Sequence, residues 1–442
     1  MKTIEYVMGQ VCEREPHLPL FHQAAEAMAR SVWPVLQKHP EWMDHRIFER
    51  LLVPDRELRF RVDWVDDEGT IHTDVGWRIQ HSDLLGPYKG GLRFGPDVDR
   101  DALRFLAYEQ TFKGALTGLP LGGAKGGATF DPHGRSDGEG MRFCQAFMSQ
   151  LAEHVGPTLD VPAGDMNVGA RELGFLYGAY RRRRSTGRGA LTGKPLSAGG
   201  IPLRTEATGF GLIYALEAAL EWTHDSIEGK RVSVSGAGNV ALFAARKALE
   251  LGARVLTLSD TAGTAHWKDG LNEDILDAVA SAKADGQHLP DFAAGLGATV
   301  RGGTPWRVET DVALPCATQN ELDGDDARAL VEGGAAMVGE GANMPCTAEA
   351  SETFAKAGIP RLPGKLANAG GVSVSGFEMA QNAQLEPWPR EVVDRKLRER
   401  MRAIHEDCVA HGREDEQIDY ERGANVASMV RLAEAMMAQG VI

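Results

Sequence analysis

A strand–turn–helix–strand segment at residues 232–260 constrains the fold more than any other part of the sequence. It reads VSVSGAGNVALFAARKALELGARVLTLSD and carries the pattern G-x-G-x-x-A at Gly236, Gly238 and Ala241. The first glycine permits a tight turn, the second lets the main chain approach a pyrophosphate, and the small third residue allows close helix–strand packing. The helix N-terminus then offers unpaired N–H groups to phosphates. The segment predicts a Rossmann-type dinucleotide site, and the alternative is a tight turn that binds nothing.

The end of the second strand bears on which dinucleotide binds. Asp260 stands where an acidic side chain accepts hydrogen bonds from the adenosine ribose. This favours NAD, because the 2′-phosphate of NADP would meet a carboxylate. Ser259 and Thr261 beside it could instead donate hydrogen bonds to such a phosphate. These residues alone leave NAD and NADP open.

The pattern of predicted strands and helices changes near residue 200. Before it, strand-like runs such as HTDVGWRIQHS (72–82) stand among helices and glycine loops, and after it ATGFGLIYALEAALEW (207–222) predicts an amphipathic helix. From Lys230 onward strands and helices alternate, which is typical of a parallel sheet. We expect an α/β protein with two domains, residues 1–200 and 201–423. A C-terminal helix at about 424–442 is expected to pack back on the first domain.

Composition excludes several classes of partner. The formal net charge of −14 argues against nucleic acid or an anionic membrane, since both select basic surfaces. The RRRR run at Arg181–Arg184 is interpreted as a solvated or intersubunit face. We expect no secretory signal and no membrane span, and the five scattered cysteines favour a reducing cytoplasm. The histidines show no metal-ligand spacing, so no metal is expected.

The first half of the chain carries lysines embedded in glycine-rich stretches. Lys125 lies in LGGAKGG, which is expected to form a glycine loop, but it lacks the spacing and the following hydroxyl of a P-loop, which argues against phosphate binding. Burial and neighbouring cations would lower the pKa of its ammonium and make it usable as an acid or base. Asp165, in the loop-like DVPAGDMNVGARELG, is a candidate carboxylate partner, although such a residue more often forms a turn.

A helix predicted over 100–116 adds a second polar group to this region. Gln110 and Lys113 are three residues apart and share one face of that helix. Together with Lys89 of GPYKGGLRF and with Lys125, they would suit a small dicarboxylate, with one cation for each end. The alternative is an ordinary solvated helix face, and spacing alone does not decide between them.

These segments together resemble the glutamate dehydrogenase family, in its compact hexameric bacterial form. The resemblance runs in order from about residue 40 to the C-terminus. It is carried by YKGGLRF, EQTFKGALTGLPLGGAKGG, MRFCQAFM, DVPAGDMNVGARELG, RTEATGFG, VSVSGAGNVA, ALPCATQNEL, GEGANMP and NAGGVSVSGFEMAQN.

The resemblance implies roles for individual residues. Lys125 would polarise the substrate carbonyl and activate water, while Asp165 would move protons to and from the amine. Lys89 and Ser375 would bind the side-chain carboxylate of glutamate, and Gln110 and Lys113 the α-carboxylate. The remaining pocket residues would be Gly164, Arg204 and Val372. The cofactor would be bound by Thr208, Gly236, Gly238, Asn239, Val240, Asp260, Ala317, Thr318, Asn343 and Asn368.

The implied reaction is the reversible oxidative deamination of L-glutamate to 2-oxoglutarate and ammonium, with hydride transfer to NADP or NAD. SDTAGT (259–264) is more similar to the NADP branch, so NADP is favoured, although only Lys283 is available nearby as a phosphate clamp. Lys89 argues against leucine- and phenylalanine-type relatives, which bind apolar side chains. The presence of both Lys125 and Asp165 argues against an inactive cofactor-binding regulator. The resemblance also implies a homohexamer, with a cleft between a substrate and oligomerisation domain and the Rossmann domain.

Overall fold

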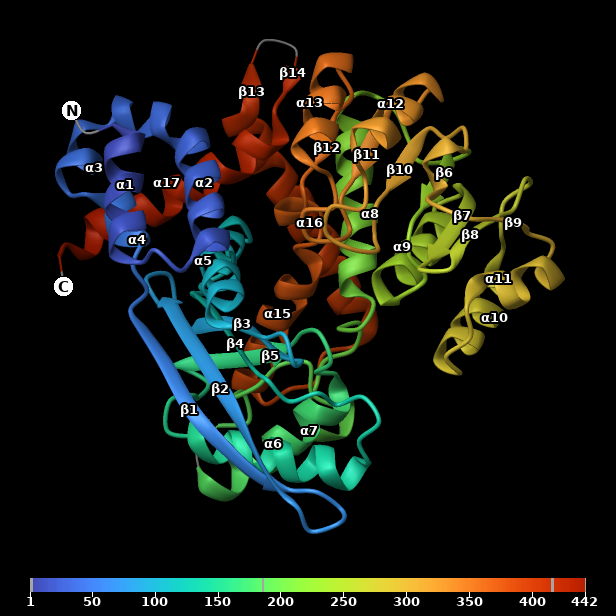
Figure 1. Ribbon diagram of the computed structural model, residues 1–442. Coiled ribbons are helices and arrows are strands. Elements are labelled where there is room, and N and C mark those ends of the chain that lie inside the picture. Colours follow the sequence, from blue (N-terminus) through green and yellow to red (C-terminus); the bar gives the residue numbers. More distant parts are fainter. Residues whose placement is uncertain (1–2, 185–186, 415–416, 442) are drawn as a thin grey trace. The chain divides into compact units, whose positions relative to one another are not determined.

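The computed structural model describes residues 3–184, 187–414 and 417–441 and divides into two compact units (Figure 1). Unit 1 comprises Met1–Pro202, Ser375–Arg390 and Asn425–Ile442, and unit 2 comprises Leu203–Val374 and Glu391–Ala424. Ser375–Arg390 had been expected in the second domain, so this part of the predicted division is wrong. Packing explains the difference, because a Cβ on Gly376 would lie 2.7 Å from Leu119 Cδ1 of unit 1.

Unit 1 is built on a five-stranded sheet with the order β1-β2-β4-β3-β5. β1 (Arg56–Val65) and β2 (Ile71–Ser82) form a long antiparallel hairpin, and β2 confirms the strand predicted at 72–82. β4 (Gly123–Ala128) runs antiparallel to β2, whereas β3 (Tyr88–Phe94) runs parallel to both β4 and β5 (Asp160–Gly164). Short β3, β4 and β5 therefore place their side chains side by side in the middle and at one edge of the sheet.

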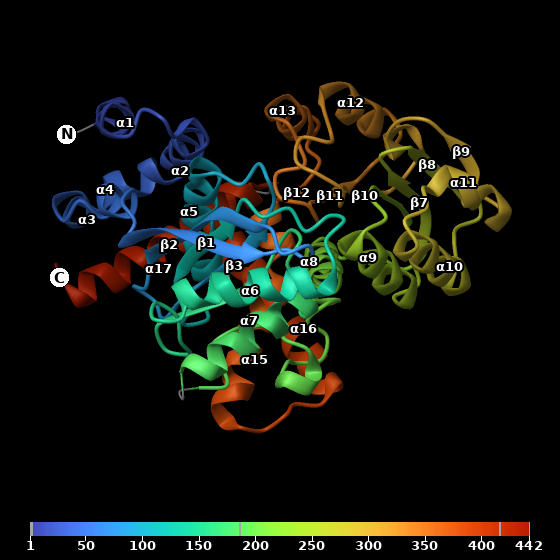
Figure 2. The ribbon, with the colours of Figure 1, turned by 60° about the horizontal axis from the view of Figure 1, so that its bottom comes forward.

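Helices cover this sheet and form a separate helical layer in unit 1. Figure 2 shows α6 running alongside the sheet with α7 next to it. The phenylalanines of α6 pack on Leu92 and Phe94 of β3, while α5 packs on β4. The helices are α1 (Ile4–Arg14), α2 (Pro19–Lys38), α3 (Pro40–Asp44), α4 (Ile47–Leu51), α5 (Arg100–Leu116), α6 (Asp137–Leu151) and α7 (Ala170–Arg183), with a 3-10 turn at Leu196–Ala198.

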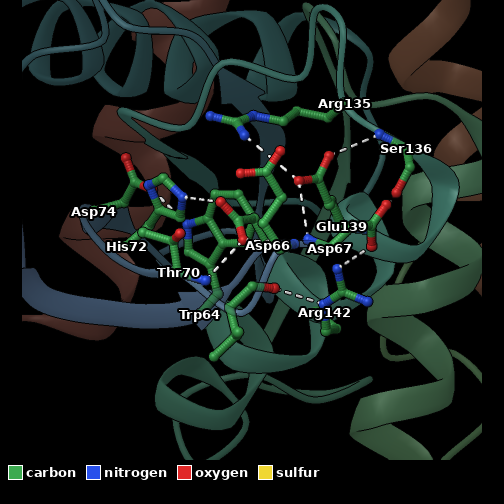
Figure 3. Close-up of polar contacts among 12 residues, drawn as sticks. Trp64, Asp66, Asp67, Thr70, His72, Asp74, Arg135, Ser136, Glu139 and Arg142 are labelled. Atoms are coloured by element: carbon green, nitrogen blue, oxygen red, sulfur yellow. Dashed lines mark hydrogen bonds and ion pairs between the residues drawn. The ribbon is translucent and has the colours of Figure 1, made fainter.

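The tip of the β1–β2 hairpin is fixed to the start of α6 by a cluster of polar contacts (Figure 3). The His72 ring stacks on Trp64 with centroids 4.6 Å apart, and its Nε2 lies 2.8 Å from Asp66 Oδ2. Ser136 and Glu139 form a capping box that begins α6. Because Glu139 also accepts a hydrogen bond from the Asp67 N–H, the helix start and the hairpin tip hold one another in place.

Unit 2 contains a seven-stranded sheet with the order β12-β11-β10-β6-β7-β8-β9. Its strands are β6 (Arg231–Val234), β7 (Arg254–Asp260), β8 (Gly263–His266), β9 (Thr299–Arg301), β10 (Val312–Leu314), β11 (Met337–Gly339) and β12 (Arg361–Leu362). The predicted parallel sheet is confirmed for β6, β7, β10, β11 and β12. β8 was not predicted. It turns back antiparallel to β7 after a two-residue connection, too short for the helical crossover that a parallel strand needs.

The helices of unit 2 are α8 (Ala207–Trp222), α9 (Asn239–Glu250), α10 (Glu273–Ala284), α11 (Leu289–Phe292), α12 (Gly324–Glu332), α13 (Ala348–Ala357), α14 (Gly364–Ala367) and most of α16 (Arg390–Gly412). Short 3-10 turns cover Ala293–Leu296 and Pro305–Arg307, and a small hairpin pairs β13 (Arg413–Glu414) with β14 (Gln417–Ile418). α8 confirms the predicted helix, but its expected polar face is wrong. Most of α8 is buried, because α9, α14 and α16 surround it.

Two helices belong to both units. α15 (Gly370–Gln384) begins in unit 2 and continues in unit 1 from Ser375, and α17 (Tyr420–Gln439) does the same from Asn425. The later turns of α17 place Met429, Leu432 and Met436 in one core with α1, α2 and α5. Among the described residues, no helix has the length and apolar character that crossing a membrane requires.

Candidate active site

Lys125 lies on a strand. The sequence predicted a glycine loop here, and that prediction is wrong. Lys125 occupies the middle of β4, where it pairs with Ile79 of β2. The surrounding glycines serve close packing. A Cβ on Gly123 would lie 2.5 Å from the Cα of Thr111 on α5, and one on Gly90 would lie 1.6 Å from the Ala124 carbonyl oxygen. Only glycine lets these layers approach so closely, and the lysine side chains project from this compact sheet.

Lys125 and Asp165, the two residues that the family resemblance implies as a catalytic pair, are in contact. Lys125 Nζ lies 2.9 Å from Asp165 Oδ1, and the Lys125 side chain is 8% exposed. Asp165 directly follows β5, so the end of the strand brings its carboxylate to the neighbouring strands. Its other oxygen, Oδ2, accepts a hydrogen bond of 2.8 Å from Nε of Arg93 on β3. Arg93 was not among the predicted site residues.

The two members of the pair have shifted protonation equilibria. Burial lowers the pKa of the Lys125 ammonium below its ordinary value, and Arg93 and Arg78 add to this effect against the opposing attraction of Asp165. This direction is the one expected from the sequence. Burial alone would raise the pKa of Asp165, but the charges of Lys125 and Arg93 outweigh it and hold that pKa below its usual range. The pair therefore combines an ionised carboxylate with an ammonium that is more acidic than that of an ordinary lysine.

The other predicted substrate residues of unit 1 lie on elements next to this pair. Lys89 is on β3 and is almost completely buried, at 1% exposure. Gln110 and Lys113 are half-buried on α5, and a Cβ on Gly90 would lie 3.4 Å from Gln110 Cγ, so this side chain reaches over β3. Gly164 ends β5 immediately before Asp165, and Ser375 is buried on α15. Partial burial of Gln110 and Lys113 is compatible both with substrate binding and with a solvated helix face.

A buried ion pair supports the same sheet and was missed by the sequence interpretation. Arg78 of β2 and Asp160 of β5 are both 0% exposed, with Nε 2.9 Å from Oδ2. Gln80 also donates to Asp160, and Arg78 donates to the Gly90 carbonyl oxygen. This network fixes β2, β3 and β5 to one another. No sequence signal marked it, because the partners are 82 residues apart.

The predicted dinucleotide turn lies between β6 and α9. Gly236 has a φ of 84°, which a non-glycine residue rarely adopts, and Gly238 is the N-cap of α9. Nothing lies within 4 Å of a Cβ built on Gly238, so the main chain there is open to a ligand. Ala241 is completely buried, as its packing role requires. The Asn239 side chain donates to the Thr205 carbonyl oxygen, and Val240 is partly exposed.

The remaining predicted cofactor residues follow other strands of the unit 2 sheet. Ala317 and Thr318 are exposed after β10, which neighbours β6 at the point where the strand order reverses. Such a point is where ligands bind in open α/β sheets. Asn368 donates to Asn343 Oδ1 at 2.9 Å, which joins the segments after β11 and α14. A Cβ on Gly371 would lie 2.6 Å from Thr208 Oγ1 and 3.5 Å from an Arg204 nitrogen; the half-exposed Val372 follows Gly371.

Asp260 accepts more hydrogen bonds from within the protein than the sequence suggested. Its Oδ2 lies 2.8 Å from Lys283 Nζ and accepts from the Leu289 N–H, while Oδ1 accepts from the Ala262 N–H. Burial opposes ionisation, yet Lys283 and the main-chain donors lower the pKa of Asp260. Most of its acceptor capacity is thus used within the protein. Among the described residues, no cluster of histidine, cysteine and acidic side chains could hold a metal ion.

Comparison with known proteins agrees with this geometry. The NADP-specific glutamate dehydrogenase of Escherichia coli (strain K12) is 49% identical over 443 residues, which cover 100% of this chain and 99% of that protein. The NAD-specific glutamate dehydrogenase of Bacteroides fragilis is 46% identical over 444 residues, covering 100% of both chains. The crystal structure of Plasmodium falciparum glutamate dehydrogenase has a TM-score of 0.96 and 42% identity, covering 99% of this chain and 95% of that chain.

Two family models also match. Residues 54–182 match the dimerisation domain of Glu/Leu/Phe/Val dehydrogenases, and residues 199–440 match the Glutamate/Leucine/Phenylalanine/Valine dehydrogenase model. The second match alone covers more than half of the chain. The resemblance seen in the sequence motifs is therefore confirmed, and the chain belongs to the Glu/Leu/Phe/Val dehydrogenase family.

Proposed function

We propose that this chain catalyses the reversible oxidative deamination of L-glutamate to 2-oxoglutarate and ammonium, with NADP preferred over NAD. The observation that carries the proposal is the contact between Lys125 and Asp165, on a sheet that also holds the buried Lys89. The names of the relatives from Escherichia coli and Plasmodium falciparum support the choice of glutamate as substrate.

The buried Lys89 supports glutamate over the apolar substrates of other family members. A desolvated ammonium attracts a carboxylate far more strongly than an aliphatic or aromatic side chain. Gln110 and Lys113 supply further donors for the α-carboxylate. The substrate would then be oriented by charge at both of its ends.

The chemistry assigned to the pair follows from its protonation. Lys125, once neutral, takes a proton from the attacking water, and as an ammonium it stabilises negative charge on the carbinolamine oxygen. Asp165 carries protons to and from the amine, a role that typically contributes about 10²–10⁴-fold to the rate. NADP, when bound, accepts the hydride from the glutamate Cα.

The surroundings of Asp260 support NADP. An isolated carboxylate at this position would repel a 2′-phosphate, but Lys283 lies 2.8 Å from Asp260 and compensates its charge. This pairing removes much of the repulsion that an unpaired carboxylate would exert on the 2′-phosphate. The names of the relatives include both NADP-specific and NAD-specific enzymes, so the preference of this chain rests on its own residues.

The direct test mixes the protein with 2-oxoglutarate, ammonium and either NADPH or NADH, and follows the loss of reduced nicotinamide. We expect rapid consumption of NADPH and slower consumption of NADH. Asp165→Asn is the matched control, and it should remove most activity while leaving NADPH binding intact. Failure to consume either cofactor would overturn the proposed function, and faster use of NADH would overturn the cofactor preference.

Assembly as a homohexamer and a cytoplasmic location complete the proposal. The match to a dimerisation domain supports an oligomer, and light scattering on the purified protein would give its subunit number. The five cysteines are all free, which suits a reducing compartment.

A further inference from the structure

Strand β3 presents a set of alternating residues to one side of the sheet. Lys89, Gly91 and Arg93 are two residues apart and therefore point the same way. A Cβ on Gly91 would lie 2.7 Å from Asp165 Cβ and 2.8 Å from the Gly164 carbonyl oxygen. Asp165 thus occupies the space that the missing side chain leaves, between the two cations of the strand.

Arg93 and Lys125 hold the two oxygens of Asp165 separately. Arg93 donates through Nε to Oδ2 at 2.8 Å, and Lys125 Nζ lies 2.9 Å from Oδ1. The Arg93 side chain is 24% exposed and that of Asp165 23%, whereas that of Lys125 is 8% exposed. The contact between Arg93 and Asp165 is therefore nearer to solvent than Lys125 is. A carboxylate held at both oxygens cannot rotate without breaking one charge-assisted hydrogen bond.

We infer that Arg93 is a positioning residue that fixes Asp165 Oδ2, so that Oδ1 faces Lys125 before substrate binds. This inference rests on the proposed function for its catalytic meaning. Arg93 acts through Asp165 and Lys125 and is not itself assigned a contact with substrate. Gly91 contributes to the same arrangement, because a side chain at this position would collide with Asp165.

The charge of Arg93 gives this role a measurable signature. Lys125 is faced by Asp165 after β5, by Arg93 from β3 and by Arg78 from β2, and Lys113 stands on α5, the helix packed on β4. Arg93 lowers the pKa of Lys125, whereas Asp165 raises it. Removing the Arg93 charge must therefore raise the pKa of Lys125, and removing the Asp165 charge must lower it.

The experiment compares Arg93→Gln with the charge-preserving Arg93→Lys. In Arg93→Gln we expect the acid limb of kcat/KM for glutamate oxidation to move up by about one pH unit, with about a tenfold loss at neutral pH. In Arg93→Lys the limb should stay near its wild-type position. Equal loss at every pH in Arg93→Gln, or no loss at all, would overturn the inference.

A second measurement does not depend on activity. The rate at which acetic anhydride modifies Lys125, followed by mass spectrometry against pH, reports the neutral amine. The midpoint should rise in Arg93→Gln, stay in Arg93→Lys and fall in Asp165→Asn. If the wild type does not oxidise glutamate, the proposed function fails, and these midpoints decide the inference on Arg93 alone. Midpoints that do not separate in these opposite directions would overturn it.

Discussion

Lys194 and Glu378 form a fully buried ion pair, with Nζ 2.6 Å from Oε1, although 184 residues separate them in the chain. Glu378 also accepts a hydrogen bond from the Gly193 N–H, and the Lys194 ammonium lies 5.6 Å from the centre of the Tyr177 ring. The pair ties the segment before residue 200 to α15, the helix that carries Ser375. Both residues belong to unit 1.

Removing one member of this pair should be strongly destabilising. Lys194→Met or Glu378→Gln leaves a single buried charge, which costs about 3–5 kcal/mol, and the double variant Lys194→Met with Glu378→Leu should lose less. Urea denaturation followed by circular dichroism measures this. The exposed pair Lys356–Glu352 is the control, and Lys356→Met should leave the unfolding curve unchanged. A double variant less stable than either single variant would contradict the coupling.

Lys89→Leu should separate substrate binding from cofactor binding. Loss of a charge-assisted contact with the side-chain carboxylate should lower kcat/KM for glutamate by about 10- to 100-fold. The Kd of NADPH, measured by fluorescence, should be unchanged, because the dinucleotide turn belongs to unit 2. Equal losses in both quantities would count against the role of Lys89.

Lys283→Gln should change the cofactor preference. Without the Lys283 ammonium, Asp260 faces the 2′-phosphate uncompensated, and we expect the KM for NADPH to rise about tenfold. The KM for NADH should change little, since NADH lacks that phosphate. Steady-state kinetics with both cofactors tests this, and parallel changes would mean that Lys283 acts only on local structure.

His81 should make the stability of unit 1 depend on pH. Burial and the nearby Arg104 lower its pKa to about 3, compared with an ordinary value of 6.5. Between these values the unfolded chain binds more protons than the folded one. Stability is therefore retained above pH 6.5 and falls by about 1.4 kcal/mol per pH unit as the pH decreases towards 3.

The variant His81→Gln isolates this effect, because Gln keeps a donor for the Leu51 carbonyl oxygen that His81 contacts. Urea unfolding of both proteins at pH 7.5 and at pH 5 should show a smaller pH-dependent loss in the variant. His405, whose pKa burial lowers to about 4, titrates in both proteins and cancels in the comparison. Identical pH dependence would mean that folding does not change the pKa of His81.

Local patterns predicted many elements with their boundaries. The helix expected at 100–116 is α5, Arg100–Leu116, and the second strand expected in the 232–260 segment is β7, Arg254–Asp260. α5 begins at a clear N-cap, Asp99, and β7 is a buried run of mainly apolar residues that ends at a charged residue. The glycines of LGGAKGG predict a loop because they lack the usual strand composition, and only the packing on α5 shows why they stand in a strand.

The sequence could not predict which residues distant in the chain contact one another. Lys283 of α10 and Leu289 of α11 contact Asp260 from 23 and 29 residues away. Arg93 stood inside the stretch YKGGLRF, four residues after Lys89, and strand periodicity could have placed both on one face. The prediction of a polar face on α8 was wrong for a similar reason, because its exposure depends on packing against α9 and α16.

The tight contacts at Gly90 and Gly123 also limit how this framework can diverge. A methyl group at either position would collide with main-chain atoms, so the layer cannot be adjusted there in small steps. Relatives that oxidise other amino acids are thus expected to differ in the side chains that project from the layer, such as the one at position 89. The glycines themselves are expected to be the same in relatives with different substrate preferences.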